Sequence, residues 1–245
     1  MGLLQQINQF LWIKPAYAKA CYNDGVVYSR LGQWKKAMKA WKRAVKFKPD
    51  YAGAYYNLGV AYGHLDRWVE AMEAYKQAVR CKPDYAEAHY NLGLACGRLS
   101  RWEEAMEAWK QAVKINPDMV DAHYNLGIAY GQLNRWDEAI EAYKRAINIK
   151  PDYAEAYCNL GVAYSKLSVV YNKLGVAHSK PDLLKDAVEV YKQAIRIRPD
   201  YAKVRFDLGC ALLLMGDKDV ALEEYKALKT LDADKASELF NMIYK

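Results

Sequence analysis

The sequence repeats itself every 34 residues, and this period constrains the fold more than any other feature. One series consists of prolines, each followed by Asp, at Pro49, Pro83, Pro117 and Pro151. Three further series with the same interval begin at Gly25, Trp34 and Ala37. Four interleaved series at one interval indicate an array of equal structural units, in which each unit is stabilised by its neighbours.

Each period is predicted to be a hairpin of two helices. In residues 86–119, two apolar stripes of helical spacing are separated by a short polar break at Ser100. We expect Asp84, with Glu87 three residues later, to cap the first helix, and Ser100 to cap the second. Pro117 ends the second helix because it has no N–H to donate.

We therefore expect an all-α solenoid of about six helical hairpins with a leading and a closing helix. A single hairpin cannot bury both of its apolar faces, so neighbouring hairpins must cover them. The predicted segments are a leading helix at 1–17, repeats at 18–51, 52–85, 86–119 and 120–153, an extra partial repeat at 154–167, repeats at 168–201 and 202–235, and a closing helix at 236–245.

One interval between successive Pro-Asp pairs is 48 residues, 14 more than the repeat length. The extra residues are a partial duplication, in which much of 157–166 recurs in 171–180. We expect 154–180 to form one long helix of roughly 40 Å, bent near Ser168, in which 154–167 lacks a second helix of its own. The duplication either has no function, or it alters the binding surface and allows self-association through this helix.

The residues that recur in each period form a recognisable set. It comprises Leu58, Gly59, Ala71, Tyr75, Ala78 and Pro83 in one period, and Leu92, Gly93, Ala105, Trp109, Ala112 and Pro117 in the next. This set resembles the tetratricopeptide repeat (TPR) family, and the resemblance covers nearly the whole chain. It implies a right-handed superhelix whose first helices line a concave groove and whose second helices form the convex back.

In the TPR family, ligand-facing side chains come from particular positions of the first helix, and here one such position is asparagine in five successive units. They are Asn23, Asn57, Asn91, Asn125 and Asn159. A carboxamide offers donors and an acceptor, which suits it to pairing with a peptide backbone. The series looks like the asparagine ladder of O-linked N-acetylglucosamine transferase, whose asparagines hold an extended peptide. Asparagine is also common at this position in the family, so the alternative is repeat consensus without a ligand role.

Aromatic and basic side chains accompany the asparagines. The aromatic residues are Tyr22, Tyr56, Tyr90 and Tyr124. The residues expected at the groove edge are Arg30, His64, Arg98 and Lys166. Tyrosine presents a large contact area with a polar tip. We therefore predict that these side chains and the asparagines form a peptide-binding site, mainly in the first four repeats.

The net charge of +7 is concentrated near the N-terminus, where residues 1–51 hold ten Lys or Arg against two Asp. Six of these cations form a basic patch on the second helix of the first hairpin, namely Lys35, Lys36, Lys39, Lys42, Arg43 and Lys46. The patch is either a solvated convex face or a docking site for an acidic protein, nucleic acid or an anionic membrane. Nucleic acid and membrane are disfavoured because the apolar stripe of this helix is needed for the hairpin core.

The sequence contains no motif for catalysis and none for a metal or cofactor. His89 and His123 occupy equivalent repeat positions and are interpreted as packing residues. The five cysteines never form Cys-x-x-Cys and are interpreted as reduced packing residues. No apolar stretch is long enough to span a membrane and no secretion signal is recognisable, so a cytoplasmic location is expected.

These features predict a non-catalytic scaffold without cofactor or small-molecule substrate, which binds an extended peptide or partner segment in the concave groove of repeats 1–4. The first alternative is an electrostatic adaptor whose basic N-terminal end docks an acidic protein, nucleic acid or an anionic membrane. The second is a regulatory subunit of an enzyme that lies on another chain.

Overall fold

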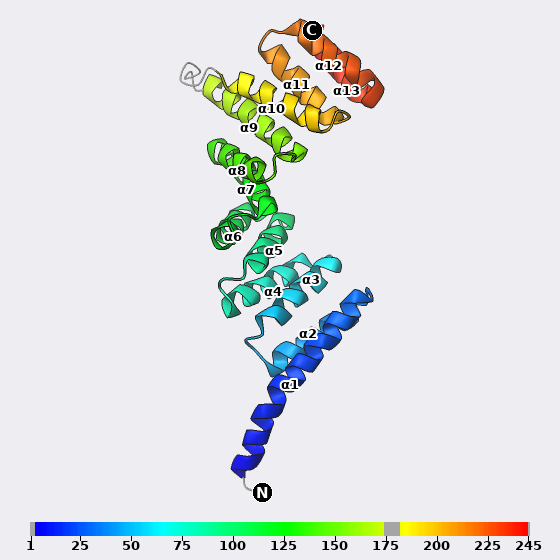
Figure 1. Ribbon diagram of the computed structural model, residues 1–245. Helices are drawn as coiled ribbons and strands as arrows, with labels where there is room; N and C mark the ends of the chain where they lie inside the picture. Colours follow the sequence, from blue (N-terminus) through cyan, green and yellow to red (C-terminus); the bar gives the residue numbers. More distant parts are fainter. Residues whose placement is uncertain (1–2, 174–181, 245) are drawn as a thin grey trace. The chain divides into compact units, whose positions relative to one another are not determined.

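The computed structural model describes residues 3–173 and 182–244, with side chains from residue 14 onward. Every regular element in these two segments is an α-helix, which confirms the all-α prediction. The chain divides into two compact units, Met1–Pro117 and Asp118–Lys245. Each unit is built from helix pairs that follow one another along the chain (Figure 1).

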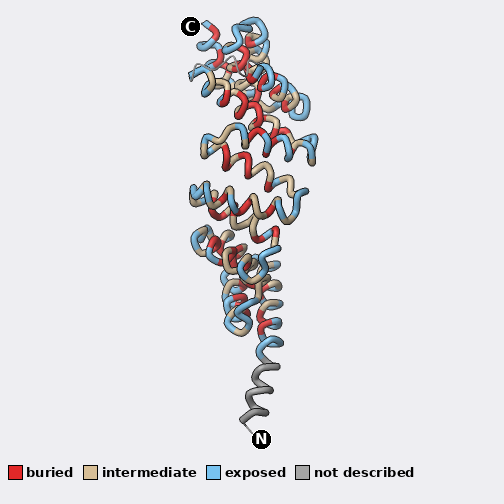
Figure 2. Tube along the Cα trace, turned by 90° about the vertical axis from the view of Figure 1, so that its left-hand side faces the viewer, coloured by how far each residue is buried: buried red, intermediate tan, exposed pale blue. Residues whose placement is uncertain are grey.

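The first unit consists of three hairpins. Its helices are α1 (Leu3–Arg30), α2 (Trp34–Phe47), α3 (Ala52–His64), α4 (Trp68–Cys81), α5 (Ala86–Arg98) and α6 (Trp102–Ile115). Within the hairpins, α1 packs on α2, α3 on α4 and α5 on α6, and between them α2 contacts α3 and α4 contacts α5. Buried residues recur along every pair (Figure 2).

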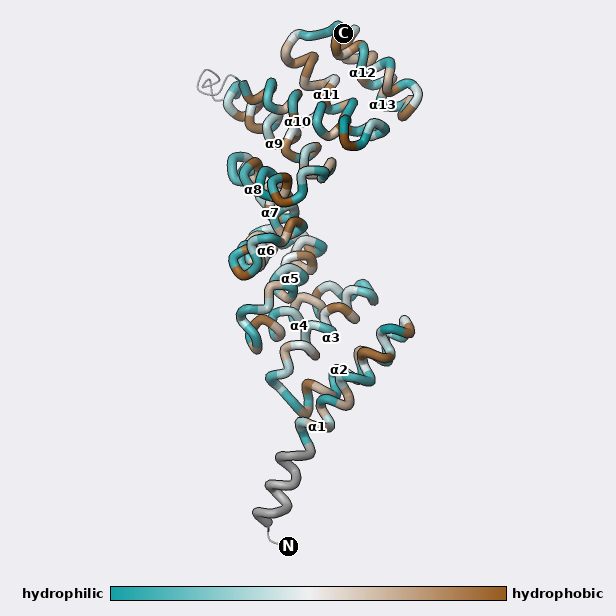
Figure 3. The backbone as a smooth tube through the Cα atoms, viewed as in Figure 1, coloured by the Kyte–Doolittle hydropathy of each residue, from teal (hydrophilic) through white to brown (hydrophobic). Residues whose placement is uncertain are grey.

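The second unit continues the same pattern and adds a final helix. Its helices are α7 (Val120–Gln132), α8 (Trp136–Ile149), α9 (Ala154–Lys173), α10 (Leu183–Ile197), α11 (Ala202–Leu214), α12 (Lys218–Leu231) and α13 (Ala233–Ile243). Here α7 packs on α8, α9 on α10 and α11 on α12, while α13 contacts both α11 and α12. Hydrophobic and hydrophilic segments alternate along these helices (Figure 3), as expected for elements with one buried side.

A glycine in the first helix lets each pair approach closely. A Cβ added to Gly59 would lie 2.5 Å from the ring of Tyr75, and one added to Gly93 would lie 2.5 Å from the ring of Trp109. Non-bonded carbons prefer separations of about 3.5–4.0 Å, so only glycine allows the aromatic ring to lie against the helix backbone. The contact recurs in the second unit, for example between Gly127 and Tyr143.

The turn inside the hairpins corrects the capping prediction. At the repeat position of Ser100, φ is 55–56° in three hairpins, and glycine with positive φ stands there in two others. The Ser100 N–H donates to the Gly97 carbonyl at 3.0 Å, so Ser100 closes α5 and does not cap α6. The residue before α6 is Arg101 and the residue before α5 is Tyr85, not Asp84, and neither makes a side-chain cap hydrogen bond.

Both ends of the described chain differ from the predicted segments. Helix α1 continues without a break from the predicted leading helix, 1–17, into the first repeat, and it contains Pro15. The missing N–H of proline removes one hydrogen bond, which the long helix tolerates because its later part packs on α2. The closing helix begins at Ala233, not at residue 236, because the Asp232 side chain accepts a hydrogen bond from the Lys235 N–H at 3.0 Å.

The duplicated region also folds differently from the prediction. Helix α9 passes Ser168 without a break and has a length of about 30 Å; residues 174–181 of the predicted long helix lie outside the described residues. Gly161, from the first copy, packs against Tyr191 of α10, with a built Cβ only 2.5 Å from the ring. The prediction that 154–167 lacks a second helix is therefore wrong. The first copy follows α8 through the regular turn and packs on it, so the extra residues lengthen α9 instead.

The glycine contact predicts opposite effects for two substitutions in the same helix. Gly59→Ala forces a methyl group into the Tyr75 ring and should destabilise the protein by about 1–3 kcal/mol. Gly53→Ala is the matched control, because its nearest neighbour would be 3.7 Å away and alanine favours the helix by up to about 1 kcal/mol. Thermal melting followed by circular dichroism should show a lower midpoint for the first variant only; equal midpoints would contradict the account.

Candidate functional site

All predicted peptide-site residues lie on first helices of the hairpins. In the first unit they are on α1, α3 and α5, and in the second unit on α7 and α9. The exposed members are Asn23, Arg30, His64, Arg98 and Lys166. The half-buried members are Asn57, Asn91, Asn125, Asn159, Tyr22, Tyr56, Tyr90 and Tyr124. None is enclosed in the core, so the first helices keep a polar and aromatic surface.

A hydrogen bond from an asparagine joins neighbouring first helices in each unit. The Asn91 Nδ2 donates to the Tyr56 hydroxyl at 3.1 Å and to the Glu87 carbonyl at 2.9 Å. The Asn159 Nδ2 donates to the Tyr124 hydroxyl at 3.0 Å. Because a carbonyl can only accept, the bond to Glu87 fixes which way the Asn91 amide faces. Its donors are used within the protein, and its Oδ1 is left as an acceptor.

The tyrosines of the predicted site hold these asparagines and are themselves held by other rings. Tyr56 packs on Tyr75 and Tyr85, with ring centroids 5.8 and 5.1 Å apart. Tyr124 packs in the same way on Tyr143 and Tyr153, at 5.9 and 4.9 Å. Tyr56 and Tyr124 therefore position the asparagines, a role that the sequence did not reveal.

Two open pockets lie beside Asn91 and Asn159. The first pocket has a volume of about 280 Å³ and is lined by Val60, Gly63, His64, Trp68, Tyr75, Asn91, Leu94 and Arg98. The second has a volume of about 400 Å³ and is lined by Ile128, Gly131, Gln132, Asn134, Trp136, Tyr143, Asn159, Val162 and Ala163. Seven residues of the first pocket have a counterpart 68 residues later in the second, so the same site is built twice, two repeats apart.

The predicted edge residues rest on the tryptophan of the preceding repeat. The His64 ring stacks on Trp34 with centroids 3.7 Å apart and an interplanar angle of 11°. The Arg98 guanidinium lies over Trp68 at 5.5 Å from the ring centroid. Stacking of this kind keeps a cation near the groove while its hydrogen-bond donors remain available.

The basic patch lies on the exposed side of α2. All six of its side chains are exposed, and among the described residues none of them forms an ion pair. Two of them lie near tyrosine rings, Lys36 by Tyr28 and Lys42 by Tyr62. Helix α2 itself contains no acidic residue. The patch is therefore an uncompensated positive surface.

Other chemistry has little support within the described segments. There, no group of three or more His, Cys, Asp or Glu is placed to hold a metal ion, and no helix is long and apolar enough to cross a membrane. The five cysteines are free, and burial raises the pKa of the Cys96 thiol to about 11. A thiol with such a pKa is a poor nucleophile near neutral pH.

The family is decided by comparison with sequence models of known repeats. A model described as TPR repeat matches residues 25–66, 64–100, 98–134, 132–168 and 184–216, and one described as tetratricopeptide repeat matches 202–235. The chain belongs to the tetratricopeptide repeat family. No curated protein sequence matches it.

Solved TPR structures share the fold. A MamA protein is 28% identical with a TM-score of 0.65, and the match covers 76% of this chain and 94% of MamA. YrrB, described as a TPR protein with an unusual peptide-binding site, is 22% identical with a TM-score of 0.64, covering 75% of this chain and 88% of YrrB. PilF of Pseudomonas aeruginosa is 18% identical with a TM-score of 0.66, covering 93% and 98%. The last two likenesses concern the fold alone.

The tyrosines beneath the asparagines give the site an alkaline limit. Burial, with smaller contributions from Tyr56 and Glu87, raises the pKa of Tyr85 to about 12. A pKa that is higher in the folded state means that the neutral phenol stabilises the fold: this stability is complete below pH 10 and is lost as the pH rises through about 12. Absorbance at 295 nm should show tyrosines ionising only near pH 12.

Two controls accompany this titration. Protein unfolded in urea should ionise all its tyrosines near pH 10, and Tyr85→Phe should remove one of the late ionisations. A single transition near pH 10 in the folded protein would contradict the burial that the structure gives to these rings.

Proposed function

We propose that this chain is a non-catalytic scaffold whose first helices bind an extended peptide segment of a partner protein. The observation that carries the proposal is the fixed amide of Asn91 and of Asn159. Each donates into the protein and presents its oxygen at a pocket. An array of acceptors set at the repeat interval suits the N–H groups of an extended chain, which lacks internal partners for them.

The family supports the same reading. TPR solenoids present an extended surface that is formed by successive repeats and shared between them. YrrB, which has this fold, is described as having a peptide-binding site. The asparagine ladder at Asn23, Asn57, Asn91, Asn125 and Asn159 is the part of that surface which we propose recognises the peptide backbone, independently of the side chains of the peptide.

Peptides selected from a phage-displayed random library test this role. The double variant Asn57→Ala with Asn91→Ala should lower the affinity for a selected peptide by roughly tenfold or more, because each lost hydrogen bond contributes about 0.5–1.5 kcal/mol. Asn148→Ala is the matched control, since Asn148 is exposed on α8, a second helix. Fluorescence polarisation with a labelled peptide gives the affinities; an unchanged Kd for the double variant would remove the asparagines from the mechanism.

The basic patch supports a second candidate function, the docking of an acidic protein segment on α2. Its six exposed cations have no carboxylate partner among the described residues, so an acidic partner would not have to displace one. Such a contact depends on charge and weakens as salt is added. Peptide binding by the asparagines depends far less on charge, and salt therefore separates the two candidates.

Charge reversal tests the patch with a poly-glutamate peptide as the probe. Lys35→Glu with Lys39→Glu should weaken binding by about tenfold, corresponding to about 1.4 kcal/mol, and 0.3 M salt, on the order of a 6 Å screening length, should abolish it. Lys192→Glu with Arg196→Glu makes the same change on exposed residues of α10 and should have little effect. Equal losses in both variants would show a non-local charge effect. Tighter binding of an oligonucleotide or of phosphatidylserine vesicles would favour those partners instead.

A further inference from the structure

One repeat position alternates between two aromatic residues, and the alternation coincides with the pockets. On the second helices this position is Trp41, Tyr75, Trp109 and Tyr143 in the first four repeats. Both pockets are lined by a tyrosine from this position, Tyr75 in the first and Tyr143 in the second. A ladder with a 34-residue period therefore contains pockets with a 68-residue period.

The larger ring of tryptophan explains the difference. A Cβ added to Gly97, in the third repeat, would meet the far ring of Trp109 at 3.4 Å. At the equivalent Gly63 and Gly131, the only atoms within 4 Å belong to Trp68 and Trp136, and the tyrosine is not among them. Tryptophan thus extends to the glycine that tyrosine leaves uncovered. In the first and second pockets, the missing ring is the space that a ligand could occupy.

The surroundings of this space indicate an apolar occupant. Its walls in the first pocket include Val60, Leu94 and the ring of Trp68, and in the second pocket Ile128 and Val162. The volumes, about 280 and 400 Å³, are near the lower end of the range for small-ligand sites and suit a single side chain rather than a cofactor. The amide oxygen at each pocket can accept one N–H.

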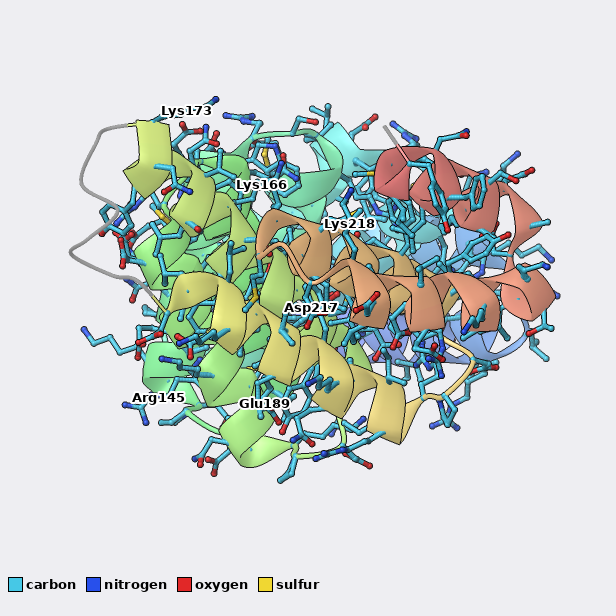
Figure 4. All side chains as sticks on the ribbon, turned by 90° about the horizontal axis from the view of Figure 1, so that it is seen from above. Arg145, Lys166, Lys173, Glu189, Asp217 and Lys218 are labelled. Atoms are coloured by element: carbon cyan, nitrogen blue, oxygen red, sulfur yellow. The ribbon has the colours of Figure 1, made fainter. Side chains whose placement is uncertain are left out.

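The rim of the first pocket adds a positive charge. Arg98 is exposed, lies over Trp68 and forms no ion pair among the described residues. Lys166 occupies the equivalent repeat position in the second unit and is also exposed, on α9 about two turns before Lys173 (Figure 4). A carboxylate next to the apolar side chain would complement either cation.

We propose that each pocket receives one apolar side chain of an extended peptide, whose N–H is accepted by Asn91 or Asn159 and whose neighbouring carboxylate faces Arg98 or Lys166. The inference rests on the proposed function and adds side-chain selection to it. The asparagines would recognise any backbone, whereas the pockets would select apolar residues next to acidic ones. Selection would occur only in the repeats that carry tyrosine at the alternating position.

Three small probes separate these parts. N-acetyl-leucinamide carries the N–H and an apolar side chain, N-acetylglycinamide lacks the side chain, and N-acetyl-leucine adds a carboxylate. Titrated into ¹⁵N-labelled protein, the leucine probes should shift the amide resonances of Gly63 and Gly131, and the glycine probe should not. N-acetyl-leucine should bind several-fold more tightly than the amide, and Arg98→Gln should abolish that advantage at Gly63 alone.

The chain supplies its own substitution for closing a pocket. Tyr75→Trp copies Trp109, which packs on its glycine as Tyr75 does, so the variant should keep the fold while it fills the first pocket. It should remove the response at Gly63 and leave the response at Gly131, and Tyr143→Trp should do the reverse. Tyr191→Trp is the matched control, because Tyr191 packs on Gly161 in the same way but lines neither pocket.

The outcomes distinguish this inference from the proposed function. Equal shifts from the leucine and glycine amides, or an unchanged Gly63 response in Tyr75→Trp with an intact circular dichroism spectrum, would overturn the pockets. The asparagine ladder would still stand if Asn57→Ala with Asn91→Ala weakened the library peptides. Equal affinity of N-acetyl-leucine and its amide would overturn the carboxylate preference. A Gly63 response that disappears only with Tyr75→Trp would support the pocket directly.

Discussion

The contact between a first-helix glycine and a second-helix aromatic ring is the constraint on which the rest of the structure depends. Gly59 against Tyr75 and Gly93 against Trp109 bring the two helices of a hairpin closer than any side chain would allow. Buried alanines such as Ala71 and Ala78 fill the remaining narrow space. With the apolar surface used between helices, the exposed side of the first helices is left for polar and aromatic residues, and the asparagines lie there.

The same aromatic position links packing to recognition. Tyrosine and tryptophan both satisfy the glycine contact, so the fold accepts either one. They differ by one ring in the direction of Gly63, Gly97 and Gly131, and that ring decides whether a pocket is filled. Next to the pockets, Tyr56 and Tyr124 hold the asparagine amides in one orientation. A site with selectivity can thus arise in alternate repeats without any change in the scaffold.

The period predicted the hairpins, because glycine, proline and apolar spacing act locally and leave few alternatives. It predicted less where two arrangements satisfy the same residues. Ser100 suits a helix cap and a left-handed turn, and only the hydrogen bond to Gly97 decides between them. The two copies in the duplicated region have nearly the same sequence, so packing of Gly161 on Tyr191 had to decide which one pairs. The asparagines were identifiable as a ladder, but the pockets depend on ring size across three helices.

The central claim is that the asparagine oxygens on the first helices accept N–H groups from an extended peptide. A crystal structure of the chain with a bound library-selected peptide tests it most directly. The account predicts the peptide along the first helices, with a main-chain nitrogen within about 3 Å of the Asn91 or Asn159 Oδ1. A peptide bound on the second helices, or one whose main chain contacts neither asparagine, would contradict it.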